Sequence, residues 1–336
     1  MSASNTSATM ARALPAQSRS WLRDLAGIAV ILVSAIVGYF LFPNNLAQLT
    51  RIIAIMQFFL SLDLVTGYCG VATLGHAALF GAGAYAAGIA AAHFGVTEPL
   101  TMIAIGAAGG ALAGLVSGVV ILRGHGLAQL VLSIAVIHLS HEAANKASAY
   151  TGGSDGLSGI APDPILGLFA FDLWGRTAYV LGIILLIIVF VLLRILVRSP
   201  FGMLCRGIRQ DPIRISAMGA SVKATLIKMY VISGAVAGIG GAFNAVSTQV
   251  VGLDSLSFTN SAEALVMLVL GGAGTLYGAF IGTIVFIGVE DFVSAANPFH
   301  WLTIVGALLI AVVLFAPKGL YGTAAALVER YRKGSK

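Results

Sequence analysis

The chain has 336 residues, of which 58% are hydrophobic and only 10% are charged, with a mean hydropathy of +0.97. This balance excludes a soluble globule, a disordered chain, a coiled coil and a nucleic-acid-binding protein, because too few charged groups remain to hydrate a surface. We therefore expect an all-α, polytopic membrane protein. Its net charge of +6 then reports topology and not a nucleic-acid partner.

A helix that crosses the hydrocarbon core of a membrane needs about 20 mainly apolar residues. Polar, glycine and proline interruptions divide this chain into segments that predict about ten transmembrane helices. These segments are residues 25–43, 46–67, 74–95, 99–122, 126–147, 176–197, 222–246, 259–274, 277–293 and 299–316. Segments 259–274 and 277–293 are short and contain glycines, so whether they fully span the membrane stays open.

The basic residues predict the orientation. With the N-terminus inside, only Arg51, Lys146 and Arg176 of the nineteen lysines and arginines fall at outer ends. Cytoplasmic loops are enriched in lysine and arginine, so both termini are expected in the cytoplasm. The predicted domains are an uncleaved cytoplasmic N-terminal tail (1–24), a transmembrane domain (25–316) and a basic cytoplasmic C-terminal tail (317–336).

Two connections are longer than the others: an outer loop at 148–175 and a basic inner loop at 198–221. In the inner loop, Asp211 suits an N-cap, Pro212 the first helical position and Gly219 a left-handed stop. The pattern predicts a short surface helix from about Pro212 to Met218. Arg206, Arg209 and Arg214 surround it with positive charge. The loop either binds a partner or simply follows the topology rule.

An ionisable side chain within a span is costly and indicates a pathway or a polar partner. Asp63 is the clearest example, and it precedes a run with Gly67, Tyr68, Thr73 and His76 in which glycines can break the helix. We interpret this run as a discontinuous helix that lines a path. In the alternative, Asp63 pairs with a neighbouring span and His76 is a hydrogen-bonded histidine at a helix end.

Other polar or small residues have simpler interpretations. His138, His141 and Glu142 share one helix without the HExxH order, so they are a weak metal motif, and we expect no metal site. Glu263, Glu290 and Asp291 are expected to be solvated or hydrogen-bonded in a cavity. Glycines at four-residue spacing indicate close helix packing; they are Gly110, Gly114 and Gly118, Gly234 and Gly238, and Gly278 and Gly282.

Cys69 and Cys205 lie far apart in the sequence and are interpreted as small apolar residues in the core. The sequence contains no GxxxxGK[ST] motif, so a P-loop in this chain cannot bind ATP. It also has no HExxH motif of a zinc metalloprotease. These absences predict a protein that is not an enzyme and binds no cofactor of its own.

Several blocks resemble LivM-type permeases of branched-chain amino acid ABC importers. GYCGVATLGHAALFGAGAY (Gly67–Tyr85) resembles the family's glycine-rich block, and TGGSDGLSGI (Thr151–Ile160) resembles its outer-loop signature. RSPFGMLCRGIRQDPIRISAMG (198–219) is similar to the cytoplasmic coupling loop, and residues 257–282 to the late glycine-rich block. APKGLYG (316–322) resembles the usual ending.

This resemblance implies a multi-pass permease in the bacterial inner membrane, among membrane lipids. Its implied partners are a second, LivH-type permease, two cytoplasmic ATPases that use ATP and Mg, and a periplasmic solute-binding protein. The residues implied for the substrate path are Asp63, Tyr68, Thr73, His76, Phe80 and Glu263. Those implied for the outer mouth are Thr151, Gly152, Gly153, Ser154, Asp155 and Gly156. Those implied for ATPase coupling are Arg206, Arg209, Asp211, Pro212, Arg214, Met218 and Gly219.

The chain departs from the family pattern at Asp63, where the family commonly has Asn, and at Thr73, where it has Ser. The resemblance implies small solutes, such as branched-chain or other hydrophobic amino acids, as substrates. Urea, short amides and small organic acids remain alternatives. Two other functions also stay open: a self-sufficient secondary transporter in which Asp63, Glu142 or Glu263 titrates, and a membrane enzyme with a metal at His138, His141 and Glu142.

Overall fold

The regular secondary structure of the computed structural model is helical throughout the residues that it describes: 18–165, 167–172, 175–296, 303, 306, 307, 310, 314 and 319–323. The chain divides into two units, Met1–Leu46 and Ala47–Lys336. The first unit contains helix α2 (Ser18–Leu41). The remaining elements are α3 (Leu46–Leu62), η1 (Asp63–Tyr68), α4 (Ala77–Phe94), α5 (Pro99–Ile121), α6 (Leu127–Lys146), α7 (Ser148–Thr151), η2 (Gly153–Asp155), α8 (Arg176–Arg198), α9 (Pro200–Gln210), α10 (Pro212–Ala217), α11 (Val222–Thr248), η3 (Leu253–Leu256), α12 (Phe258–Gly271) and α13 (Leu276–Ala296).

Seven helices in the described part of the chain are long and apolar enough to cross a membrane. They are Leu46–Tyr68, Ala77–Phe94, Pro99–Ile121, Leu127–Lys146, Arg176–Arg198, Val222–Thr248 and Leu276–Ser294. The prediction of an all-α, multi-pass membrane protein is therefore confirmed, whereas the count of ten is not. Helix α12 has 14 residues, a length of about 21 Å that is shorter than the hydrocarbon core. The described apolar part of α2 covers only Ile31–Leu41. Most of predicted segment 299–316 lies outside the described residues, as do most of the two predicted tails.

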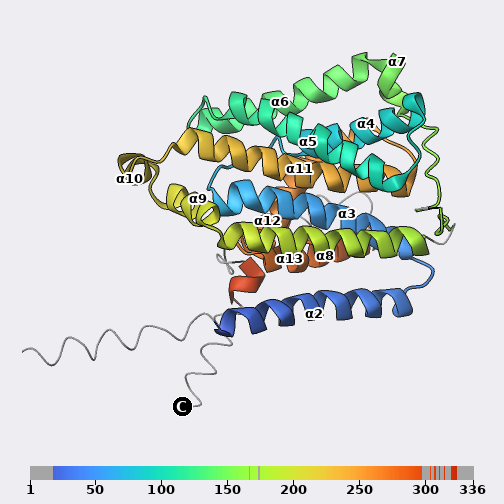
Figure 1. Cartoon of the computed structure of the whole chain (residues 1–336), viewed down its shortest axis with the longest axis horizontal. Coiled ribbons are helices and arrows are strands. Elements are labelled where there is room, and N and C mark those ends of the chain that lie inside the picture. The colour runs from blue at the N-terminus through green and yellow to red at the C-terminus, as the bar shows by residue number, and fades with distance from the viewer. Residues whose placement is uncertain are drawn as a thin grey trace, which may run out of the picture. The chain divides into compact units, whose positions relative to one another are not determined.

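The spans run between two opposite ends of the second unit (Figure 1). The basic loop with α9 and α10 lies at one end, and the loop that follows α7 lies at the other. This outer loop is tied to the segment before η3, because Leu157 and Val251 exchange two backbone hydrogen bonds of 2.8 and 3.0 Å. The two loops that were predicted to lie on opposite sides of the membrane thus lie at opposite ends of this unit.

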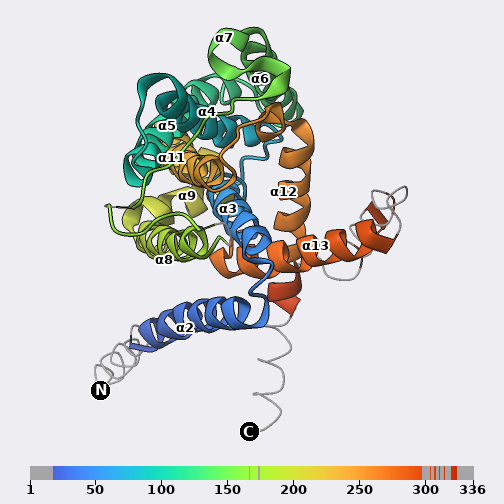
Figure 2. The same cartoon turned by 90° about the vertical axis from the view of Figure 1, so that its right-hand side faces the viewer.

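The predicted glycine packing is confirmed between α5 and α11. A Cβ atom added to Gly110 would lie 2.2 Å from the carbonyl oxygen of Gly234, and one added to Gly114 would lie 2.4 Å from that of Tyr230. Helix α4 joins them, since a Cβ at Gly83 would lie 2.3 Å from the Cα of Gly238. The backbones of these three helices are therefore in direct contact, as small residues in membrane helices allow. Figure 2 shows the three helices grouped together, with α12 apart from them.

The predicted helix interruption is also confirmed. The α3 span widens into the π-helix η1 and then breaks at Gly70, whose φ of +76° is left-handed. Short π-helical turns occur frequently at functional sites. A Cβ at Gly67 would lie 2.4 Å from the backbone nitrogen of Gly274, so the turn between α12 and α13 packs directly against this break.

Helices α12 and α13 form a second discontinuous pair. Gly272 and Gly274 turn the chain with φ values of +104° and +84°. After the turn, Gly282 packs against α12, since its Cβ would lie 2.4 Å from the carbonyl oxygen of Met267. A Cβ atom added to Gly319 of the C-terminal motif would lie 2.4 Å from the Cα of Gly272, so these two residues pack directly against each other. Two breaks and the C-terminal motif thus converge at one place.

Candidate functional site

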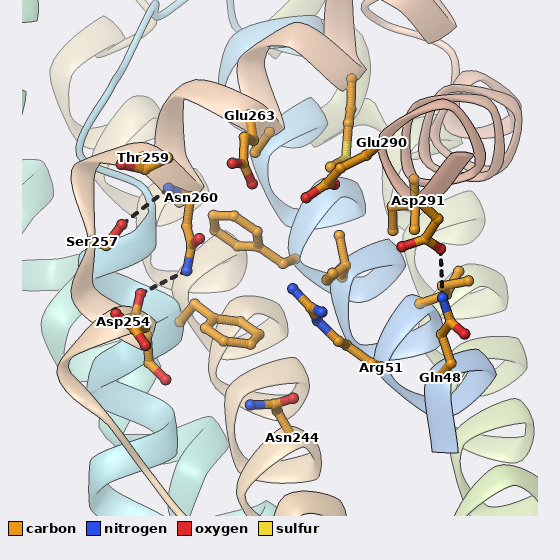
Figure 3. A pocket seen from close by; sticks show the side chains of 18 residues that line it. Gln48, Arg51, Asn244, Asp254, Ser257, Thr259, Asn260, Glu263, Glu290 and Asp291 are labelled. Carbon is orange, nitrogen blue, oxygen red and sulfur yellow. Dashed lines mark hydrogen bonds between the residues drawn. The ribbon is translucent and has the colours of Figure 1, made fainter. Parts of the chain in front are cut away.

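A cavity of about 460 Å³ lies between α3, α4, α11, α12 and α13 (Figure 3). Its volume falls in the range of small-molecule sites. It is formed where α3 and α12 begin and α13 ends, at the end of the unit that carries the outer loop. The lining residues are Gln48, Arg51, Ile52, Ile55, Phe58, Phe80, Asn244, Asp254, Ser255, Ser257, Thr259, Asn260, Glu263, Ala264, Met267, Ile287, Glu290 and Asp291.

Three charged side chains extend into this cavity from three helices (Figure 3): Arg51 from α3, Glu263 from α12 and Glu290 from α13. The two glutamates lie close enough to repel each other, and both are attracted by Arg51. Among the described residues, however, Arg51 forms no ion pair within 4.0 Å. Glu263 and Glu290 are partly buried, where an unpaired charge is costly, whereas Arg51 is exposed to solvent. This arrangement therefore leaves three charges available to a ligand.

Other polar residues of the cavity are already held. Gln48 Nε2 donates a hydrogen bond of 2.5 Å to Asp291 Oδ2, and Asn260 Nδ2 donates one of 2.6 Å to the carbonyl oxygen of Asp254 (Figure 3). The backbone N–H of Asn260 donates to Ser257 Oγ at 3.3 Å, the N-cap of α12. These bonds fix the rim of the cavity.

The deeper part of the cavity is apolar. The rings of Phe58 and Phe80 lie 5.2 Å apart between their centroids, and both side chains are buried. Met267 and Ala264 add apolar surface from α12. A charged mouth above an apolar floor suits a solute that carries charged groups on one side and a hydrocarbon side chain on the other.

Of the six residues predicted for the substrate path, Phe80 and Glu263 line this cavity. The other four are buried behind it; they are Asp63, Tyr68, Thr73 and His76. Their predicted part in the path stays a prediction, and the contacts of Asp63 and His76 correspond to the alternative given for these two residues.

Asp63 is fully buried, and its Oδ1 accepts a hydrogen bond of 2.6 Å from the backbone N–H of Gly274. It thus pairs with a neighbouring segment 211 positions later in the chain. In the turn between α12 and α13, the carboxylate of Asp63 accepts the hydrogen bond that the N–H of Gly274 would otherwise need from a backbone carbonyl. This contact joins the two helix breaks.

His76 precedes α4 and has no exposed surface. Its Nε2 lies 3.0 Å from Ser61 Oγ and 3.1 Å from Ser233 Oγ, so it forms hydrogen bonds with α3 and α11. Its ring stacks on Phe58 with a centroid distance of 5.8 Å. His76 therefore supports the cavity floor from behind. Thr73 is equally buried, and its Oγ1 accepts a 3.2 Å bond from the N–H of Gly75.

Helix α9 was not predicted, although Ser199 and Pro200 carry the signal. Ser199 Oγ accepts a hydrogen bond of 3.3 Å from the N–H of Gly202, and Pro200 occupies the first turn. The helix is amphipathic and brings two predicted coupling residues to the first break. Arg206 lies 5.2 Å above the ring of Tyr68, and Arg209 donates a hydrogen bond to the carbonyl oxygen of Gly67.

The structure brings Cys69 and Cys205 together, which their sequence separation did not predict. Both are buried free thiols, as expected of small core residues, and a hydrogen bond links the two side chains. The hydrogen bond from Cys69 lowers the pKa of the Cys205 thiol, although burial acts in the opposite direction. The pair joins the break after η1 to α9.

The predicted surface helix is confirmed as α10, and it ends close to the expected residue. Asp211 Oδ1 accepts a hydrogen bond of 3.0 Å from the N–H of Arg214, Pro212 begins the helix, and Gly219 has a φ of +87°. Ile213 and Met218 are 79% and 76% exposed. Its predicted coupling role remains a prediction.

The outer-loop signature forms a compact turn that does not line the cavity. Thr151 Oγ1 donates a hydrogen bond of 2.6 Å to the carbonyl oxygen of Ala144, and Gly152, Gly153 and Gly156 all have positive φ. Ser154 and Asp155 are exposed. Through Leu157 the turn is attached to the segment that supplies Asp254 to the cavity rim.

The histidine cluster on α6 does not form a metal site in the described part of the chain, where no group of three metal-binding side chains is present. His138 stacks against Phe258 with a centroid distance of 6.2 Å. Glu142 forms an exposed ion pair of 3.4 Å with Lys146. No contact favours the metal-enzyme interpretation.

The comparison with protein families decides the membership of the chain. The model of the permease component of branched-chain amino acid transport systems matches residues 42–313. The chain belongs to this family. The matched residues of this branched-chain amino acid permease include every residue that lines the cavity, from Gln48 to Asp291. They also include helices α9 and α10.

The individual relatives share 30% sequence identity or less with this chain. The chain is 25% identical to the high-affinity branched-chain amino acid transport system permease protein LivM of Escherichia coli K12, over 91% of this chain and 77% of the relative. The LivM protein of Salmonella typhimurium is 24% identical over the same shares. LivH of Escherichia coli K12 is 30% identical over 37% of this chain and 40% of its own length. No solved structure gives a significant match.

Proposed function

We propose that this chain is the permease subunit of an ABC importer in the bacterial inner membrane, and that it carries branched-chain or other hydrophobic amino acids. Family membership and the similarity to LivM over 91% of the chain support this function. The seven apolar helices agree with a multi-pass subunit.

The observation that carries the proposal is α10. A permease without a nucleotide-binding site of its own must receive force from an ATPase, and the contact must lie on the cytoplasmic side. Helix α10 is short, capped and exposed, and Ile213 and Met218 extend from it without burial. Its N-terminal neighbour α9 bonds to the break after η1. A displacement of α10 by the ATPase would therefore be transmitted through α9 to the discontinuous helices.

The proposed partners follow from the family. They are a LivH-type permease, two cytoplasmic ATPases that use ATP and Mg, and a periplasmic solute-binding protein. The partial similarity of this chain to LivH supports pairing of two related permeases. The charged cavity is the proposed solute-binding part of the path. Thr151–Gly156 do not line this cavity, and their proposed role is at the outer mouth of the path.

Purification of the tagged chain from its own host in a mild detergent tests the assembly. We expect two ATPases and a second permease to accompany it, and we expect uptake by the complex in liposomes to require ATP and the binding protein. Uptake by the isolated chain, driven by a proton or sodium gradient without the ATPases, would refute this assignment and favour a secondary transporter.

A further inference from the structure

We propose that this chain itself recognises both charged ends of an α-amino acid in the cavity. The ammonium group lies between Glu263 and Glu290, the carboxylate lies against Arg51, and the side chain extends toward Phe58 and Phe80. This inference rests on the proposed function, because it assumes that the cavity is part of the transport path.

The first argument is the unused charge. Arg51 and the two glutamates come from three different helices and extend into one cavity (Figure 3). Among the described residues, neither Glu263 nor Glu290 accepts a hydrogen bond, and Arg51 forms no ion pair within 4.0 Å. A guanidinium binds a carboxylate through two parallel hydrogen bonds, and a carboxylate pair binds an ammonium group. An amino acid supplies both complementary groups at once.

The second argument is the net negative charge of the residues that line the cavity. One cation, Arg51, faces four acidic residues: Asp254, Glu263, Glu290 and Asp291. A solute with a carboxylate alone enters an acidic cavity and is repelled, since like charges across a site are costly. A neutral solute such as urea leaves the charges unpaired. The ammonium group is therefore the required feature.

The third argument is that the cavity has hydrogen-bonded rim groups, free charged groups and an apolar surface. The Asp291 carboxylate is bonded to Gln48 and the Asn260 amide to the backbone carbonyl of Asp254, so these two side chains are occupied, whereas the Asp254 carboxylate is exposed. The free charges share the cavity with the rings of Phe58 and Phe80, which provide an apolar surface. A volume of about 460 Å³ accommodates one small amino acid with water. No group of three metal-binding side chains occurs in the described residues, so a metal ion is not the better ligand.

Protection of a cysteine in the cavity tests this inference in the intact permease complex without the binding protein. Asn244→Cys places a thiol on the lining, while the native cysteines are buried. The rate of its alkylation by a charged maleimide is measured with leucine, with leucinamide, which lacks the carboxylate, and with 4-methylpentanoate, which lacks the ammonium group. We expect leucine to protect at concentrations about tenfold lower than either analogue.

Substitutions of the three charged residues test which of them binds the carboxylate and which bind the ammonium group. With Arg51→Gln, leucine should protect no better than leucinamide, and Arg51→Lys should recover part of the difference. With Glu263→Gln and Glu290→Gln, leucine should lose its advantage over 4-methylpentanoate. Glu142→Gln removes an exposed carboxylate on α6, away from the cavity, and should leave protection unchanged. Ser148→Cys, at an exposed position on α7 outside the predicted outer mouth, should not be protected by any of the compounds.

Two measurements separate this inference from the proposed function. Equal protection by all three compounds, or none, in a complex whose uptake still requires ATP would overturn the cavity assignment and leave the importer assignment intact. Selective protection by leucine in a chain whose uptake continues with inactive ATPases would support the cavity and refute the importer. Arg51→Lys keeps the charge and serves as the second variant if Arg51→Gln does not assemble.

Discussion

The guanidinium of Arg209 donates a hydrogen bond to the carbonyl oxygen of Gly67, which connects α9 to the first helix break across 142 positions of sequence. Gly67 in turn packs against Gly274, whose N–H donates to Asp63. Helix α9 and two discontinuous helices are therefore joined within a few bonds. This relationship leads to the first prediction.

Arg209→Gln should uncouple ATP hydrolysis from transport. It removes a charge-assisted hydrogen bond of about 1.5–3 kcal/mol, so solute moved per ATP hydrolysed should fall about tenfold. Uptake and phosphate release are measured together in liposomes. Lys228→Gln is the matched control, because Lys228 is an exposed cation on α11. An unchanged ratio in Arg209→Gln would show that this bond does not transmit the motion.

Asp63→Asn should leave the substrate profile unchanged. The asparagine oxygen can still accept the hydrogen bond from Gly274, and Asp63 lies outside the cavity. Asp63→Leu leaves that N–H buried without an acceptor and should cost about 1–3 kcal/mol of folding free energy. Competition among solutes for uptake and the thermal unfolding midpoint of each variant test both statements. An altered profile in Asp63→Asn would place the carboxylate on the path.

Gly110→Ala should destabilise the protein, because its Cβ would lie 2.2 Å from the carbonyl oxygen of Gly234. Separating two packed backbones should cost about 2 kcal/mol, more than the gain from replacing a helical glycine. The control is Gly288→Ala on α13, where nothing lies within 4 Å. The thermal midpoint should fall only for Gly110→Ala, and equal midpoints would mean that α5 and α11 separate without cost.

Oxidation of Cys69 and Cys205 should form a disulfide and stop transport. The lowered pKa of Cys205 favours the thiolate that starts the reaction. A membrane-permeant oxidant is added, the cross-linked peptide is quantified by mass spectrometry, and a reductant should restore uptake. Cys205→Ser should be insensitive. Full cross-linking with normal uptake would show that α9 and the break do not separate during the cycle.

Local patterns predicted much of the fold. The capped helix α10, the interruption after Asp63 and the four-residue glycine spacing within α5 and within α11 depend on residues within a few turns of one another. Hydropathy alone could not distinguish the 14-residue helix α12 from a full span, because the glycines that end it also occur inside spans.

The cavity could not be predicted in the same way. Arg51 was interpreted only as a marker of an outer end, and Glu290 only as a solvated or hydrogen-bonded cavity residue. Their proximity to Glu263 depends on how α3, α12 and α13 pack, and no spacing rule reports contacts across 200 residues. The pairing of Asp63 with Gly274 and that of Cys69 with Cys205 were missed for the same reason.

The direct backbone contacts of α4, α5 and α11 have a mechanical consequence. At the glycine contacts the backbones touch, and the side chains of Leu79 and Tyr230 fill neighbouring space between the helices, so we expect the three helices to move together as one block. The cavity takes Phe80 and Asn244 from that block and its free charges from α3, α12 and α13. If the cavity binds the solute as proposed, opening it to either side of the membrane requires this block to shear against the helices that carry the charges, and the contacts with the solute then change during transport.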